Sequence, residues 1–320
     1  MSYQSHLRMD LSNITPLKHA MDYYNRSYSN MGANYSVTDL YKPAQVCRLG
    51  KRYAHLVDKM GRLKRKEDGT TEWYVTLMSF RGTAIHNNLE YNLRMYIKDH
   101  PEVRFNPKTL TGYILERRLW DRIEDRRISG QFDVWYNQIL YDWKISSVWK
   151  YVHQDFTDYE NQVNLYGYLC DLWDIPFKKG YIVLWMSDWQ KNTYDKGYPS
   201  EPLALIDIPI WDKSTQKEYF HNLVKTHKAT EELPDTELPE CTMEDRWATK
   251  DAYPVMKKGQ KKAVRVKGMD TYQNALDFIN MKPVDEQKQY YIDKRIGKST
   301  RCEDFCDIKN YCHQYKRMIG

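Results

Sequence analysis

Two aspartates and a lysine lie within residues 128–146, whose pattern predicts two adjacent strands. Asn137-Gln138 marks the tight connection between them. Because side chains alternate along a strand, Asp142 and Lys144 point to one face, and Asp133 lies at the end of the preceding strand. Ionised groups that face a sheet core are costly unless they are paired or bind a metal. The pattern indicates a converging polar centre, and a surface hairpin with an ordinary Asp–Lys ion pair is the alternative.

Two carboxylates and one ammonium are the minimum set for metal-assisted cleavage of a phosphodiester. The carboxylates bind a hard divalent cation, which polarises the phosphate and lowers the pKa of its bound water, while the lysine orients that water or stabilises the developing charge. We therefore expect a divalent-metal-dependent nuclease.

The chain around this centre alternates between predicted helices and strands. A helical segment at 36–59 precedes a helix that begins near Arg81. A further helix at 155–174 and a buried strand at 181–185 follow the acidic strands. This order indicates an α/β (α+β) fold with a mixed central sheet flanked by helices. With a boundary in the Pro- and Glu-rich stretch 231–240, we expect an N-terminal tail and helical cap (1–80), a core (81–230) and a basic, cysteine-bearing C-terminal segment (231–320).

Composition limits the compartment and the partner. No apolar run in the 320 residues approaches the roughly 20 residues of a membrane span, so we expect no membrane helix. Residues 1–30 lack the basic start and apolar block of a secretory signal, so a cytoplasmic protein is expected. The net charge of +6 includes two basic runs, 59–66 and 257–267, which either suit a polyanion such as DNA or are solvated faces.

Further motifs accompany the acidic strands in a definite order: His86, Asp133, Asp142-Trp143-Lys144, and Gln162 with Tyr166. In this order, from about residue 36 to 185, the chain resembles the PD-(D/E)XK nuclease superfamily, specifically its RecB-like branch, which includes AddB-type exonucleases and CRISPR-associated adaptation nucleases. The resemblance implies a restriction-endonuclease-like core. Phe132 stands where the signature proline would precede the first aspartate, but RecB-like members commonly carry Gly-x-x-Asp, as Gly130 to Asp133 does here.

The resemblance implies a role for each matching residue. The ligands of Mg²⁺ or Mn²⁺ would be three side chains and one backbone carbonyl: His86, Asp133, Asp142 and Trp143. Lys144 would activate the attacking water, and Glu116 would support the metal shell through water. Gln162 and Tyr166, four residues apart on one helix face, would lie beside the site and contact DNA. Taken singly, a histidine such as His86 is more often an ordinary helix residue, and the Gln-x-x-x-Tyr pair could be helix surface.

Three of the six cysteines lie close together in a polar C-terminal stretch: Cys302, Cys306 and Cys312. In a chain without an export signal, this clustering indicates a metal or iron–sulfur site rather than disulfides. Zinc or a 4Fe-4S cluster normally needs a fourth thiolate, and Cys47 and Cys241 are the candidates. Cys170, in a predicted apolar helix, is expected to pack in the core.

The resemblance also bears on the fourth thiolate. Iron–sulfur RecB-like enzymes combine three C-terminal cysteines with one distant N-terminal partner, which points to Cys47, but Cys47 lacks the usual Cys-Pro-Arg context. Phage and prophage nucleases of this architecture are similar to this chain around 239–247, through 255–259 and at the cysteine triplet, which favours Cys241. The closed loop would then include the basic run 257–267.

These observations predict a metal-dependent DNA exonuclease, with endonuclease action secondary, in phage DNA recombination, replication or processing. The expected partners are DNA ends and phage recombination or replication proteins in the host cytoplasm. The alternative is a catalytically silent nucleic-acid-binding module that uses the nuclease fold and the cysteine cluster for assembly. A zinc-stabilised interaction protein unrelated to DNA would require the ordered motifs to be coincidental.

Overall fold

The computed structural model describes residues 31–53, 73–191 and 197–320. The chain forms two compact units, Met1–Leu233 and Pro234–Gly320, which we call unit 1 and unit 2. The polar N-terminal tail and the basic run at 59–66 lie outside the described residues.

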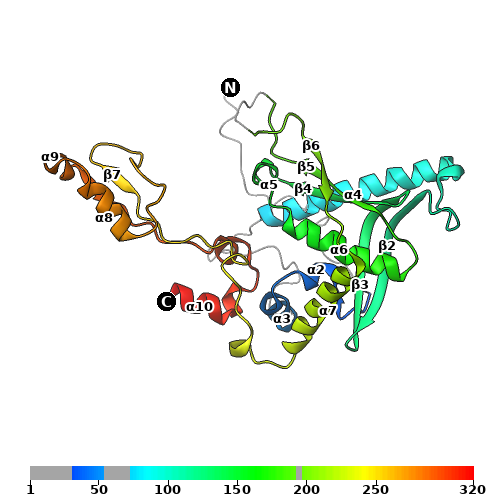
Figure 1. The fold of residues 1–320 in the computed structure, drawn as a ribbon. Helices are drawn as coiled ribbons and strands as arrows, with labels where there is room; N and C mark the ends of the chain where they lie inside the picture. Colours follow the sequence, from blue (N-terminus) through cyan, green and yellow to red (C-terminus); the bar gives the residue numbers. More distant parts are fainter. Residues whose placement is uncertain (1–30, 54–72, 192–196) are drawn as a thin grey trace, which may run out of the picture. The chain divides into compact units, whose positions relative to one another are not determined.

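Unit 1 is built on a six-stranded mixed sheet in the order β1-β3-β4-β5-β6, with β2 paired to β3 (Figure 1). β1 is parallel to β3 and β4 is parallel to β5, whereas the other pairs are antiparallel. The strands are β1 (Tyr35–Ser36), β2 (Tyr113–Ile123), β3 (Arg126–Tyr136), β4 (Ile139–Ser146), β5 (Lys179–Met186) and β6 (Leu203–Ile208). The predicted α/β fold with a mixed central sheet is therefore confirmed.

Two tight turns set the register of the central strands. Glu124 and Asp125 join β2 to β3, and Asn137 and Gln138 join β3 to β4. All four residues have positive φ, between 49° and 66°. Positive φ at both central residues is the signature of a type I′ turn, whose twist matches that of the flanking strands. The predicted connection at Asn137-Gln138 is confirmed.

Helices flank the sheet, and α6 and α7 lie side by side (Figure 1). The described helices of unit 1 are α2 (Val37–Leu40), α3 (Ala44–Arg52), α4 (Trp73–Asp99), the 3₁₀ turn η3 (Pro101–Val103), α5 (Val148–His153), α6 (Thr157–Leu172) and α7 (Lys213–Ala229).

Two helix boundaries differ from prediction. Ser36 caps α2 with a capping box, but Pro43 then stands at the N-cap of α3, so the described part of the segment predicted from residue 36 is two short helices. α4 begins at Trp73 rather than near Arg81. Residues 73–80 contain neither glycine nor proline, so nothing in the sequence stops the helix before Arg81.

The core of unit 1 forms where β3 meets α6 and α2. Leu169 and Cys170 are fully buried, which confirms that Cys170 packs in the core. A Cβ atom at Gly130 would lie 2.7 Å from the Leu169 side chain and 2.8 Å from that of Val37. Gly130 is therefore required for the close approach of this strand to its covering helices.

Unit 2 is smaller and has its own core of four residues: Val255, Met269, Ala275 and Ile279. Its regular elements are η4 (Asp235–Glu237), β7 (Val255–Lys257), α8 (Tyr272–Asn280), α9 (Val284–Gln287), β8 (Tyr290–Ile292), the π-helical turn η5 (Arg301–Phe305), η6 (Lys309–Tyr311) and α10 (His313–Ile319). The basic run 257–267 follows β7 and precedes α8. Within the described ranges, every helix is too short or too polar to cross a bilayer.

Candidate functional site

The candidate site lies where β3 and β4 separate. Their pairing ends at Val134 opposite Tyr141, and β4 continues along β5 instead. At this fork the Asp133 carboxylate accepts a hydrogen bond of 2.7 Å from the Trp143 backbone N–H. A side chain thus replaces the ladder hydrogen bond that the next residue pair would have made. The fork opens space inside the sheet in which polar groups can converge.

A compact group of three potential ligands occupies this fork. One ligand atom each from His86, Glu116 and Asp133 lie within 4.8 Å of one another. The Nδ1 atom of His86, which belongs to α4, lies 3.5 Å from Oδ2 of Asp133. An imidazole and two carboxylates are ligands that Mg²⁺ and Mn²⁺ sites use. The group therefore fits a divalent cation.

Glu116 reaches this group because of the register of β2. Leu115 pairs with Val134 and Arg117 with Phe132, so Glu116 lies across from Asp133. Its φ of +48° is in the left-handed region, which a non-glycine residue in a strand rarely adopts. Such backbone strain persists only where the surrounding structure enforces it, and strained residues are common at functional sites.

The electrostatics of the group favour an added cation. Burial, reinforced by the charge of Asp133, raises the pKa of Glu116 to about 7. A hydrogen bond of 2.8 Å from Gln131 Nε2 to Glu116 Oε2 opposes this shift only in part. Although burial disfavours a charged imidazole, the Asp133 carboxylate raises the pKa of His86. Two acids close together in a buried place are stabilised by a positive charge.

Asp142 and Lys144 form a buried ion pair beside the group. Asp142 is 1% exposed, and its Oδ2 atom contacts the Lys144 ammonium. Burial raises the pKa of Asp142 against the opposing charge of Lys144. Burial disfavours the ammonium, yet the charges of Asp142 and Asp133 raise the pKa of Lys144. Lys144 is therefore a charged group at the fork, and its ammonium partly compensates the buried Asp142 carboxylate.

The structure groups the predicted site residues differently from the sequence-based expectation. The sequence places Asp142 among the ligands and Glu116 behind a water, whereas the compact group contains Glu116 and leaves Asp142 with Lys144. Trp143 meets Asp133 through its N–H. Sequence reasoning missed Gln131, which orients Glu116. The signal was available, because Gln131 and Asp133 share one strand face.

Gln162 and Tyr166 of α6 are buried, with exposed fractions of 5% and 3%. Gln162 Nε2 donates a hydrogen bond of 2.8 Å to Tyr166 Oη. Burial, followed by the charges of Asp142 and Asp133, raises the pKa of Tyr166. The pair therefore faces the acidic fork from α6, and its burial excludes the alternative that it is ordinary helix surface.

The cysteines separate between the units. Cys47 is buried in the core of unit 1. In unit 2, burial raises the pKa of Cys241 to about 12, and the charges of Asp245 and of the cysteine triplet add to this effect. Gln314 holds Cys241 in place, since its side chain accepts from the Cys241 N–H (2.9 Å) and donates to the Cys241 carbonyl (2.8 Å). Cys241 thus lies within electrostatic reach of the other three thiols of unit 2.

The four thiols of unit 2 are not drawn tightly together. Among the described residues, no three cysteine sulfurs lie within 4.8 Å of one another. Sulfurs bound to one tetrahedral zinc ion at about 2.3 Å would be separated by about 3.8 Å. A single zinc ion would require them to move closer.

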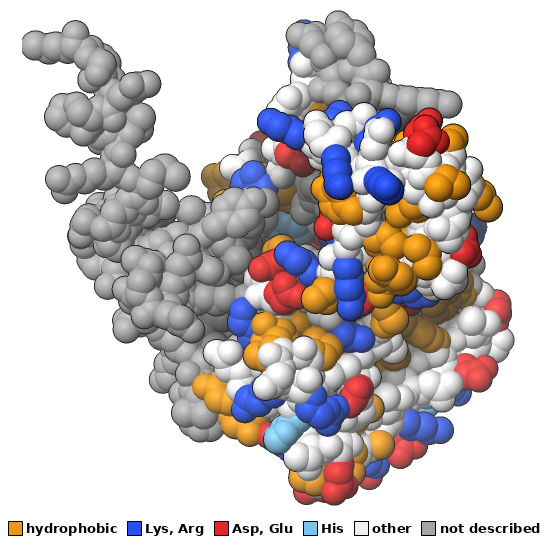
Figure 2. Space-filling view, turned by 90° about the vertical axis from the view of Figure 1, so that its left-hand side faces the viewer, with side chains coloured by type: hydrophobic (Ala, Val, Ile, Leu, Met, Phe, Trp, Pro, Cys, Tyr) orange, Lys and Arg blue, Asp and Glu red, His pale blue; other side chains and the backbone are white. Residues whose placement is uncertain are grey.

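The surface of unit 1 carries mixed charge. On the face in Figure 2, lysine and arginine side chains are scattered among hydrophobic, acidic and neutral ones instead of forming one basic patch. Any attraction for a polyanion on this face is consequently local rather than due to a uniform field.

Comparisons with known proteins leave the family open. No family model matches the chain, and no curated protein matches it. Among solved structures, a protein named SSO0001 is 18% identical with a TM-score of 0.41, covering 70% of this chain and 91% of its own. A protein named "Putative exonuclease" from Eubacterium rectale is 13% identical with a TM-score of 0.35, covering 74% and 98%. Both TM-scores are below 0.5, so these likenesses establish neither the fold nor the activity.

Proposed function

We propose that this protein is a divalent-metal-dependent deoxyribonuclease. The observation that carries the proposal is the compact group of His86, Glu116 and Asp133 next to the buried pair of Asp142 and Lys144. A bound Mg²⁺ or Mn²⁺ supplies Lewis-acid activation of the scissile phosphate and of a water molecule. Hydrolysis then needs no covalent enzyme intermediate.

Each side chain of the site has a separate task in this proposal. His86, Glu116 and Asp133 hold the cation, and the Asp142 carboxylate beside them is a further candidate ligand. The Lys144 ammonium orients the attacking water and stabilises the charge that develops on the phosphate. The surrounding burial strengthens these electrostatic interactions because it excludes bulk water.

The order of the motifs supports a more specific assignment. We infer a RecB-like member of the PD-(D/E)XK superfamily, of phage type, that degrades DNA from its ends. The Gln162–Tyr166 pair and the Trp143 carbonyl belong to that motif set, and the buried position of the pair against the acidic fork is consistent with a place beside the reacting phosphate.

A cleavage assay with a matched pair of lysine variants tests the assignment. With Mg²⁺ or Mn²⁺, wild-type protein should shorten end-labelled linear DNA and leave circular DNA intact. Lys144→Ala should lower the rate about 10³-fold while DNA affinity remains near normal. Lys213→Ala is the control, because it removes an exposed ion pair with Asp171 and should cleave at the wild-type rate. Wild-type turnover by Lys144→Ala would refute the proposal.

Absence of cleavage by the wild-type protein would favour the alternative function. If wild-type protein binds DNA but does not cleave linear or circular substrates with either metal, the catalytically silent binding module is the better assignment. The buried acids of the fork argue against that outcome, because they are costly to keep and a protein that only binds phosphate does not need them.

We further propose that unit 2 binds a 4Fe-4S cluster through Cys241, Cys302, Cys306 and Cys312. The mutual electrostatic influence of these thiols supports the set, and Cys47 is the alternative to Cys241. The metal-binding free energy would add to the folding free energy of this small unit. Zinc is the alternative metal.

Anaerobic purification with visible absorbance and metal analysis separates these possibilities. If the assignment is right, the purified protein should contain iron and show broad absorbance near 400 nm, with about one cluster per chain. Cys241→Ser should abolish the colour, whereas Cys47→Ser should retain it. Stoichiometric zinc without colour, or loss of colour only in Cys47→Ser, would overturn the assignment.

A further inference from the structure

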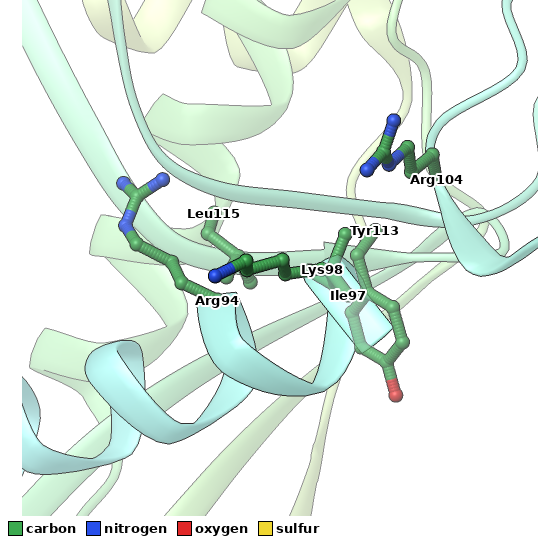
Figure 3. A pocket seen from close by; sticks show the side chains of 6 residues that line it. All are labelled: Arg94, Ile97, Lys98, Arg104, Tyr113 and Leu115. Carbon is green, nitrogen blue, oxygen red and sulfur yellow. The ribbon is translucent and has the colours of Figure 1, made fainter. Parts of the chain in front are cut away.

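A basic groove runs between the C-terminal half of α4 and the start of β2. It has a volume of about 320 Å³ and is lined by six residues: Arg94, Ile97, Lys98, Arg104, Tyr113 and Leu115. Figure 3 shows the three cationic side chains around it, with Ile97 and Leu115 between them. All six residues belong to unit 1, and none has a role in the proposed chemistry.

The charges of this groove are only partly neutralised. Arg94 Nη2 lies 2.7 Å from Oε1 of Glu90, which fixes that guanidinium one helical turn from the acid. Among the described residues, no carboxylate oxygen lies within 4.0 Å of the Lys98 or Arg104 side-chain nitrogens. The acids of the neighbourhood, Asp99 and Glu102, are exposed. The groove therefore presents two uncompensated cations and a third that is held in position.

The groove continues from the candidate metal group along both of its walls. On α4, His86, Glu90, Arg94 and Lys98 follow one another at four-residue spacing and so form one row on the helix. On β2, Leu115 of the groove directly precedes Glu116 of the metal group. With a rise of 1.5 Å per residue, Arg94 and Lys98 lie about 12 and about 18 Å along the axis from His86.

An aromatic surface completes the wall. The Tyr113 ring stacks on Tyr136 with centroids 4.1 Å apart and an interplanar angle of 22°. Tyrosine rings held in this way offer a flat face to a nucleobase, and stacking of this kind tolerates any base. Cations spaced along a channel with an aromatic wall are the pattern that binds single strands without sequence preference.

We propose that this groove binds the sugar–phosphate backbone of the DNA strand that adjoins the scissile phosphate, as a single-stranded segment. Arg94, Lys98 and Arg104 neutralise its phosphates, and Tyr113 stacks against one base. This inference rests on the proposed nuclease function, which places the scissile phosphate at the metal group, so that the strand runs from there into the groove. At about 3.4 Å per stacked nucleotide, a strand from the metal group reaches Arg94 after about four nucleotides and Lys98 after about five.

Length-dependent binding tests this inference without requiring cleavage. Fluorescence anisotropy in Ca²⁺ would compare labelled dT3 and dT12 on the full chain, with the triple variant R94A/K98A/R104A. The affinity for dT12 should fall at least about 10-fold, and the slope of log K against log salt should decrease by about 2 for three lost phosphate contacts. The affinity for dT3, which is too short to reach the groove, should change less than twofold.

The control removes the same charge elsewhere. The variant K213A/K217A/K225A takes three exposed lysines from α7 and should bind both oligonucleotides like wild type. If both triple variants lose the same affinity for dT12, the effect is one of net charge and the inference is overturned. The inference is also overturned if the groove variant loses equal affinity for dT3 and dT12. Thermal unfolding of both variants checks that each is folded.

The two proposals fail separately. If the groove variant binds dT12 normally while wild-type protein cleaves DNA, the groove assignment is wrong and the nuclease assignment stands. If the groove variant loses dT12 binding while wild-type protein never cleaves, the nuclease assignment is wrong and the groove stands as a single-strand-binding surface.

Discussion

Unit 1 contains two polar clusters, one around Glu231 and one around Glu116, whose surroundings shift the pKa of the glutamate in opposite directions. At Glu231, just after α7, the Arg126 Nη2 atom lies 2.5 Å and the Arg48 Nη2 atom 3.5 Å from carboxylate oxygens, and the Tyr35 hydroxyl donates a further hydrogen bond. These donors, Arg126 foremost, lower the pKa of Glu231 to about 2. The cluster joins β1, α3 and β3 to the end of the unit.

At the fork the balance is reversed. Glu116 and Asp133 face one histidine, and burial raises the pKa of Glu116 to about 7. The same type of side chain in the same unit is thus stabilised as an anion in one place and destabilised in the other. Burial dominates at Glu116, whereas the hydrogen bond from Arg126 dominates at Glu231. A cluster whose carboxylate is fully paired with donors, which we call saturated, strengthens the fold. A cluster whose carboxylates lack such partners leaves a place for a cation from solution.

The largest expected effect comes from neutralising one acid in each cluster. Glu116→Gln should lower metal-dependent DNA cleavage about 100-fold or more, because the amide is a poor ligand for the cation. Its stability without metal should be unchanged or higher, since the substitution removes a charge close to Asp133. Glu231→Gln should show the reverse, with cleavage within twofold of wild type and lower stability. End-labelled DNA assays and urea unfolding of both variants provide the measurement. Loss of cleavage in both would erase the distinction between the clusters.

Metal binding should stabilise the fork and leave the Glu231 cluster unaffected. At 100 times its dissociation constant, Mn²⁺ should raise the free energy of unfolding by about 2.7 kcal/mol. The gain should disappear in Asp133→Asn and persist in Glu231→Gln. Urea titrations with Mn²⁺ and with EDTA measure this difference. An equal gain in Asp133→Asn would place the bound ion elsewhere.

The pH dependence of stability should identify the saturated cluster. Because the folded pKa of Glu231 is lowered from 4.5 to about 2, its contribution is fully present above pH 4.5 and is lost as the pH falls towards 2. Its side chain is 16% exposed, so with solvent screening we expect Glu231→Gln to cost about 1.5 kcal/mol at pH 7. The difference from wild type should vanish near pH 2. A difference that grows on acidification would contradict the assignment.

The contrast also separates what sequence pattern can predict from what it cannot. Alternation was enough to place Asp142 and Lys144 together, and Asn137-Gln138 was enough to locate a turn, because both depend on neighbours in the chain. Glu116 depends instead on which residue of β3 it faces. That register is set by Glu124-Asp125, which begins with neither asparagine nor glycine, so this turn has no clear signal in the sequence.

Burial of Gln162 is equally hidden from the sequence. A helix with one apolar stripe should expose its polar residues, yet Asn164 is fully buried because it hydrogen-bonds to the Pro209 carbonyl and accepts from the Trp211 N–H. α7 and the segment after β6 cover α6 from a second side. Polar residues on that helix are therefore internal, and only tertiary packing reveals it.

The smallest expected effect concerns the hydroxyl of Tyr166, which connects the core to the fork. Tyr166→Phe removes the acceptor of the Gln162 hydrogen bond and leaves that buried amide with one partner fewer, at a cost of about 1 kcal/mol in stability. If the hydroxyl only supports packing, cleavage should fall less than threefold at saturating Mg²⁺ and KM for DNA should not change. A role next to the reacting phosphate instead requires kcat to fall well beyond threefold, with the same loss of stability. Steady-state kinetics and urea unfolding of this variant, with Tyr168→Phe as the control on the same helix, distinguish these two roles, because Tyr168 donates to Asp121 and lies outside the fork.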